Sequence, residues 1–80
     1  MDVAAKVKQI IAEQLGVDEP EIKMESHFID DLGADSLGLL NLAEAIDARY
    51  GIQLQGDDLV DIANVGELVK LVESKIALKS

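Results

Sequence analysis

The sequence contains no cysteine and no tryptophan, and Phe28 and Tyr50 are its only aromatic residues. Without cysteine the chain can form no disulfide and offers no thiolate to a metal, so any thiol chemistry must come from an added group. Because 49% of the residues are apolar and almost none of these is aromatic, the core must consist of leucine, isoleucine, valine and alanine. Such a core favours packed helices over a sheet.

Long apolar runs are also missing, and no stretch approaches the roughly 20 residues that span a bilayer. The first six residues lack the basic and then apolar pattern of a signal peptide. We therefore expect a cytoplasmic protein, or an organellar one after processing, that makes no use of a membrane. A chain of 80 residues suits a single domain, residues 1–80, and we expect it to be a monomer.

Positive charge is scarce in the middle of the chain. Residues 24–69 contain ten acidic side chains and one base, Arg49, whereas six acids and six lysines cancel elsewhere, so this stretch holds the whole net charge of −9. Nucleic acid is excluded as a partner because its phosphates require lysine and arginine. Opposite charges steer encounters, so the expected partners are proteins with basic patches. The alternative is a charged face that only keeps the domain soluble.

The spacing of apolar residues predicts an all-α bundle of four helices, three longer and one short. Gly16 and Gly51 follow the first and second helices as C-cap glycines. The expected ranges are 3–15, 36–50, 57–62, and a last helix that starts after Asn64. The core face of the second helix consists of Leu39, Leu42, Ala43, Ile46 and Tyr50.

The last helix begins with a capping-box-like pair, Asn64 and Glu67. Lys75 and Lys79 lie near its end, where cations complement the helix dipole. The long loop before the second helix, residues 17–35, is expected to have a function or a short helix of its own.

The segment Asp31-Leu32-Gly33-Ala34-Asp35-Ser36-Leu37 leads into the second helix. Asp35 is a good N-cap, so the hydroxyl of Ser36, the first helical residue, is free to point into solvent. A phosphate ester at this position would lie near the positive end of the helix dipole. The alternative is that Asp35 and Ser36 only start a helix.

The residues of this region raise two alternative chemistries, hydrolysis by a serine nucleophile and binding of calcium. The elbow of serine hydrolases needs glycine two residues before and after the serine, and Ala34 occupies the first position while Gly38 fits the second. His27 is the single histidine and the only candidate base for Ser36. The acidic loop fits no register of an EF-hand calcium site, which leaves only loose binding of divalent cations.

Leu37 and Leu40 fall outside the core face of the second helix, on the same side as Glu44 and Asp47. Leucines ringed by acids are typical of a docking face with an apolar centre and a charged rim. The alternative is two ordinary surface leucines.

The motif of residues 31–37 resembles the attachment motif of acyl carrier proteins, and the resemblance covers nearly the whole chain. Residues 7–17 resemble the first helix of that family. Phe28, the turn of residues 50–54 and residues 62–65 match it as well.

The resemblance implies that a phosphopantetheinyl transferase (holo-acyl-carrier-protein synthase) uses coenzyme A to attach 4′-phosphopantetheine to Ser36. The thiol of that arm would hold acyl groups as thioesters, in fatty acid or related lipid biosynthesis, and the chain itself would be a carrier without catalytic residues or metal. The residues implied to contact basic patches on acyl-processing enzymes are Asp35, Leu37, Leu40, Glu44 and Asp47. The implied lining of an acyl pocket is Phe28, Leu42, Ile46, Leu54, Leu59, Ile62 and Leu68.

Three positions depart from the resemblance. Carriers of bacterial fatty acid synthesis usually have acids where this chain has Gly38 and Asn41, and often at Ala48. These departures favour, as an alternative, a specialised carrier of polyketide or aminoacyl groups. An unmodified acidic interaction domain is the alternative from another class of function.

The concentration of acids between residues 24 and 69 generates a prediction about stability. Mutual repulsion in the folded state is screened by salt and by divalent cations, so the melting temperature should rise with ionic strength. Thermal unfolding followed by circular dichroism measures this. A melting temperature that is independent of salt would contradict the prediction, because it would mean that the acids are already paired.

Overall fold

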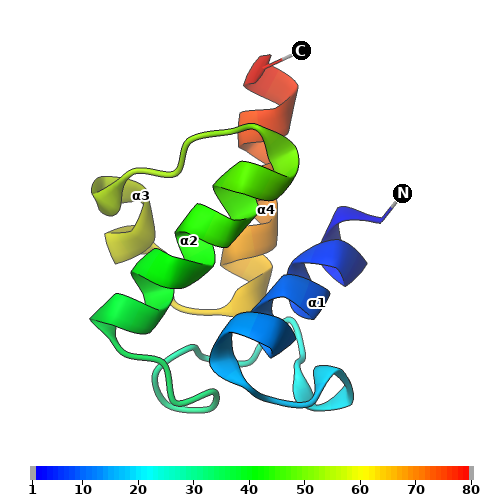
Figure 1. Cartoon of the computed structure of the whole chain (residues 1–80), viewed down its shortest axis with the longest axis vertical. Helices are drawn as coiled ribbons and strands as arrows, with labels where there is room; N and C mark the ends of the chain where they lie inside the picture. Colours follow the sequence, from blue (N-terminus) through cyan, green and yellow to red (C-terminus); the bar gives the residue numbers. More distant parts are fainter. Residues whose placement is uncertain (1, 80) are drawn as a thin grey trace.

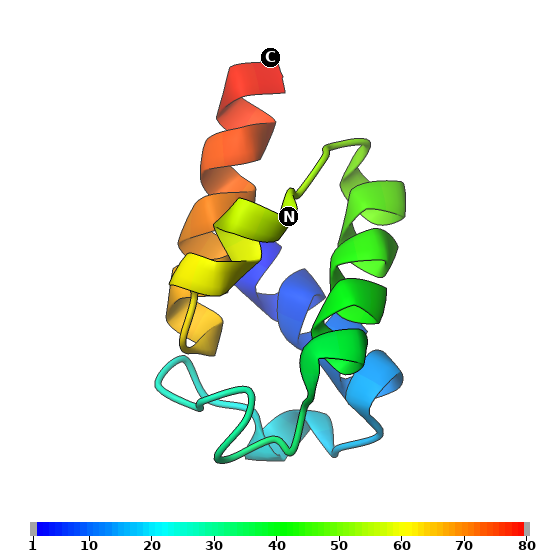
Figure 2. The ribbon, with the colours of Figure 1, turned by 90° about the vertical axis from the view of Figure 1, so that its left-hand side faces the viewer.

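The computed structural model describes residues 2–79. In chain order the elements are α1 (Val3–Leu15), the 3-10 helix η1 (Glu19–Glu21), α2 (Ser36–Tyr50), α3 (Gly56–Asp61) and α4 (Val65–Lys79). The short helix α3 lies at one side of the bundle formed by α1, α2 and α4 (Figure 1, Figure 2). Residues 2–79 contain no β-strand, only an isolated bridge between His27 and Asn64. The prediction of an all-α bundle with three longer helices and one short helix is confirmed.

The bounds of the longer helices follow from caps that the sequence encodes. The Asp2 carboxylate accepts the N–H of Ala4 at 3.1 Å at the start of α1. Gly16 and Gly51 end α1 and α2 with φ values of 70° and 65°, in the left-handed region that glycine adopts without strain. The predicted ranges of these two helices are therefore confirmed to the residue.

The cap of α4 differs in one detail from the expected box. The Asn64 side chain accepts the N–H of Glu67 at 2.9 Å as predicted, but the Glu67 carboxylate accepts the N–H of Ala63 instead of that of Asn64. At the other end of α4, the Lys79 ammonium donates to the Tyr50 carbonyl at 2.9 Å. Lys79 lies in the last turn of α4 as predicted, and it also caps the C-terminus of α2.

The core is aliphatic, with one aromatic exception. Phe28 is 2% exposed and fixes the loop of residues 17–35, which also contains η1. Leu39 and Tyr50, expected in the core, are half-buried at its edge. The buried apolar residues are Val7, Ile10, Ile11, Ile22, Phe28, Leu32, Ala34, Leu42, Ala43, Ile46, Leu54, Val65, Leu68, Val69 and Val72. Among residues 2–79, no helix is both long and apolar enough to cross a membrane.

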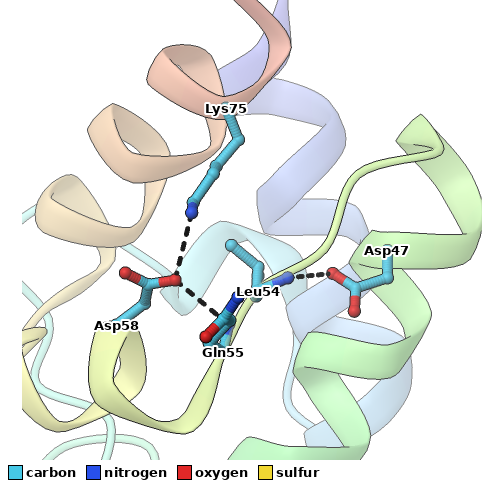
Figure 3. Close-up of polar contacts among 5 residues, drawn as sticks. All are labelled: Asp47, Leu54, Gln55, Asp58 and Lys75. Carbon is cyan, nitrogen blue, oxygen red and sulfur yellow. Dashed lines mark hydrogen bonds and ion pairs between the residues drawn. The ribbon is translucent and has the colours of Figure 1, made fainter. Parts of the chain in front are cut away.

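The short helix α3 starts and ends one residue earlier than predicted. A capping box sets its start: Gln55 is the N-cap, and the Asp58 carboxylate accepts the N–H of Gln55 at 3.0 Å. Ile62 lies outside the helix because its backbone is extended, with φ −89° and ψ 131°. The same Asp58 carboxylate pairs with the ammonium of Lys75 on α4 at 3.3 Å (Figure 3). Lys75, expected to complement the α4 dipole, thus joins α3 to α4.

These contacts make part of the stability dependent on pH. The hydrogen bond from the Gln55 backbone lowers the pKa of the Asp58 carboxyl, and Lys75 lowers it further, while desolvation opposes both effects. A carboxyl with a lowered pKa stabilises the fold above its usual pKa of about 3.9, and this contribution is lost as the pH falls through the lowered value. Asp58→Asn should therefore melt below the unsubstituted protein at neutral pH.

The difference in melting temperature should begin to shrink as the pH falls below about 4, where the unfolded state takes up the proton, and should vanish below the lowered folded pKa, where Asp58 is protonated in both states and resembles Asn. Thermal unfolding of both proteins between neutral and strongly acidic pH provides the measurement. A difference that stays constant over this range would show that Asp58 does not act through its charge.

Candidate functional site

The turn before α2 is fixed to the core on one side. Gly33 has a φ of 69°, which a residue with a side chain rarely adopts. The next residue, Ala34, is buried, and its N–H donates to the Phe28 carbonyl at 2.8 Å. The position of the backbone directly before α2 is therefore fixed by Ala34.

At the start of α2, Asp35 acts as the N-cap. Its carboxylate oxygen Oδ1 accepts the N–H of Gly38 at 2.7 Å. Ser36 is the first residue of the helix; it is exposed, and its hydroxyl makes no hydrogen bond to any residue between 2 and 79. The hydroxyl is thus open to solvent beside the free N–H groups of a helix N-terminus, a position that suits an attached phosphate.

A groove of about 340 Å³ lies next to Ser36, between α2 and α3. Apart from Ser36 itself, every residue that lines it is apolar or glycine: Ile29, Leu39, Leu40, Gly56, Leu59, Val60 and Ile62. A neighbouring depression of about 300 Å³ shares Ile29, Leu39 and Ile62 with the groove and extends to Phe28 and His27. The open hydroxyl and the apolar groove therefore adjoin each other.

The predicted pocket residues divide into two sets. Leu59 and Ile62 line the groove, and Phe28 lines the adjoining depression. Leu42, Ile46, Leu54 and Leu68 are at most 8% exposed and line neither, since they are packed inside the core. An acyl chain would reach these four only if the bundle opened.

The exposed apolar surface at the predicted docking face is larger than the sequence indicated. Leu37 and Leu40 are 66% and 50% exposed, which confirms that they lie outside the core. Ile29 and Val60, 65% and 82% exposed, belong to the same surroundings of Ser36 because both line the groove. Sequence reasoning missed them because Ile29 lies in an irregular loop and Val60 in a helix of six residues, so neither belongs to a helical repeat that assigns it to a face.

The acids of the docking face differ in what they contact. Glu44 is exposed and accepts no hydrogen bond from residues 2–79. Asp47 is half-buried, and its Oδ1 atom accepts the N–H of Leu54 at 2.9 Å (Figure 3). Asp35 is occupied by the cap of α2. Glu44 is therefore the predicted docking acid whose carboxylate is fully available.

The alternative chemistries gain no support from the geometry. His27 lines the second depression and not the groove at Ser36, and no hydrogen bond joins the two side chains in the described chain. Residues 2–79 contain no group of three histidine or acidic side chains placed to hold a metal ion.

Two of the three departures on α2, Gly38 and Asn41, lie in different surroundings. A Cβ atom at Gly38 would stand 3.2 Å from the Asp35 Oδ1 atom and 3.5 Å from the Leu15 side chain. Asn41 is exposed. Position 38 is therefore turned toward the cap and α1, whereas position 41 is open to a partner.

Residues 5–72 match the model of a protein family described as the phosphopantetheine attachment site. An acyl carrier protein of Clostridium acetobutylicum is 46% identical over 72 residues, which cover 90% of this chain and 94% of the relative. One of Thermotoga maritima is 43% identical over 75 residues, which cover 94% and 93%. A solved structure from Mycobacterium tuberculosis, provisionally assigned as an acyl carrier protein, superposes with a TM-score of 0.80 at 24% identity and covers 99% of this chain and 100% of its own. At that identity the superposition shows a shared fold.

Proposed function

This chain belongs to the acyl carrier protein family, and from that premise we propose that Ser36 is the residue to which its 4′-phosphopantetheine is attached. The observation that carries the proposal is the Ser36 hydroxyl, which is exposed and unbonded at the start of α2 because Asp35 already caps the helix. A prosthetic group can be added there without breaking a contact of the fold.

The residues around Ser36 suit the attached group. The arm supplies a thiol, which this cysteine-free chain lacks, and acyl groups are carried on that thiol as thioesters. The N-terminus of α2 favours the negative phosphate. We propose that the groove lined by Leu59 and Ile62 shelters the acyl chain, with an apolar surface that excludes water from it.

The chemistry on the acyl group belongs to partner enzymes, since members of this family are carriers and not enzymes. We propose that a phosphopantetheinyl transferase and acyl-processing enzymes dock on Leu37, Leu40 and the acids around them. The concentration of negative charge in residues 24–69 supports basic patches as the complementary surface. We further propose that the chain acts as a cytoplasmic monomer of one domain, in fatty acid or related lipid biosynthesis.

A specialised role in polyketide or aminoacyl transfer is the second candidate. The observation that favours it is the neutral character of Gly38, Asn41 and Ala48 on α2, which makes the docking helix less negative than in the carriers that this chain resembles.

The attachment site can be tested by intact mass. Coexpression with a phosphopantetheinyl transferase should increase the mass of the protein by that of one arm, and Ser36→Ala should abolish the increase because it removes the exposed hydroxyl at the start of α2. Ser26→Ala is a matched control, since Ser26 is 8% exposed and its hydroxyl accepts the N–H of Lys23. If the unsubstituted protein stays unmodified, the unmodified interaction domain becomes the better explanation.

The departures on α2 generate a second prediction. Asn41→Glu should accelerate association with a phosphopantetheinyl transferase about two- to tenfold at low salt, because the added charge is exposed to a basic partner. Gly38→Asp, which adds the same charge turned toward Asp35, should give a smaller gain. Stopped-flow association at several salt concentrations measures both. Equal gains from the two variants would show that only net charge matters.

A further inference from the structure

The short helix α3 is weakly held by apolar packing. None of its six residues is buried, and Val60 is 82% exposed. Nevertheless α3 forms one wall of the groove beside Ser36, through Gly56, Leu59 and Val60. The position of this wall must therefore depend strongly on contacts other than a buried apolar face.

Two carboxylates hold the N-terminal end of α3 (Figure 3). Asp58 caps the helix at Gln55 and pairs with Lys75 of α4. Asp47 of α2 accepts the N–H of Leu54, the residue directly before that N-cap, at 2.9 Å. This hydrogen bond is partly buried, so the Leu54 N–H loses a favourable partner and gains only limited access to water if the carboxylate is withdrawn.

Asp47 thus has two possible partners. It is one of the acids on the docking side of α2, and it is also the acceptor that fixes the backbone at the entry to α3. A carboxylate prefers a bidentate arrangement with a guanidinium, which needs both of its oxygens. An arginine that takes Asp47 in this way shares Oδ1 with the Leu54 N–H and draws the carboxylate toward itself, which weakens the bond to Leu54.

We propose that Asp47 is a positioning residue whose carboxylate holds α3 against the groove beside Ser36, and that a cationic side chain of a docking partner loosens α3 by taking this carboxylate. The proposal rests on the proposed function for the identity of the docking surface and of the groove. The Asp47 carboxylate has two states, one bonded to the Leu54 N–H and one released from it. A partner that binds the released state more tightly than the bonded state shifts the protein, by thermodynamic linkage, toward the form in which α3 is loosened from the groove.

The first experiment follows amide hydrogen exchange by NMR in the full chain without its prosthetic group. Asp47→Ala removes the acceptor and should accelerate exchange at Leu54 on the order of tenfold, while Asp47→Asn keeps an acceptor oxygen and should restore much of the protection. Glu44→Ala, a change on the same helix without a bond to the linker, is the matched control and should leave Leu54 unchanged.

Asp47→Ala should also increase the fluorescence of an apolar dye that enters the groove. Exchange at the core amides of Ile46 and Val72 reports global unfolding and is expected to change less than exchange at Leu54. Unchanged exchange at Leu54, or unchanged dye fluorescence, in a folded Asp47→Ala protein would overturn the proposal.

The second experiment adds a hexaarginine peptide as the cationic probe. Exchange at Leu54 should accelerate in the unsubstituted protein but not in Asp47→Asn, whose neutral amide cannot form the charged bidentate pair with a guanidinium. This comparison uses only folded variants that keep an acceptor at position 47. No acceleration in the unsubstituted protein when the peptide is bound, or equal acceleration in Asp47→Asn, would overturn the proposal. Neither experiment needs the phosphopantetheine arm, so a negative result would contradict the role of Asp47 without contradicting attachment at Ser36.

Discussion

The hydrogen bond from the Gly38 N–H to the Asp35 carboxylate is the contact on which the site depends. A serine at the start of a helix often serves as the cap and is thereby occupied. Here the residue before it fulfils that need, so the Ser36 hydroxyl remains accessible while the helix stays intact. The Asp35 side chain therefore fixes the start of the helix, and the Ser36 side chain, the proposed attachment point, stays accessible.

The rest of the molecule consists of a tightly packed part, α1, α2 and α4, and a loosely packed part, α3. α1, α2 and α4 provide most of the buried aliphatic residues, and the loop before α2 is anchored there by Phe28. α3 contributes no buried residue and is joined to the bundle through polar contacts of Asp58 and the linker before it. This division suits the proposed function, because the prosthetic group and the partners need a fixed platform and the proposed cargo groove needs a wall that can move.

Much of this fold could be predicted from the sequence because its caps are local. Asp35, Gly16 and Gly51 mark the ends of long helices within a few residues of the bonds that they make. Contacts between distant segments were harder to predict. The position of Lys79 in the last turn of α4 follows from the sequence. Nothing in the sequence reveals that its ammonium also reaches the carbonyl of Tyr50, 29 positions away.

The site shows the same limit. Ser36 and the exposed Leu37 and Leu40 follow from one motif and one helical wheel, whereas the groove is assembled from α2, α3 and a residue of the long loop. Its lining therefore depends on how the elements pack. The family resemblance implies Leu42 in the lining, yet this core residue is 2% exposed and lines neither the groove nor the adjoining depression.

The bond between Lys79 and the Tyr50 carbonyl has a consequence for anyone who attaches probes to this molecule. It ties the ends of α2 and α4 together, so the linker toward α3 starts from an anchored corner. A Cβ atom at Gly51 would stand 2.8 Å from the Lys79 nitrogen and displace that flexible ammonium, and the φ of 65° disfavours a side chain there as well. A dye at exposed Leu78 would therefore sit on the stationary half of the protein and serve as a reference, and one at Val60 would travel with the groove wall.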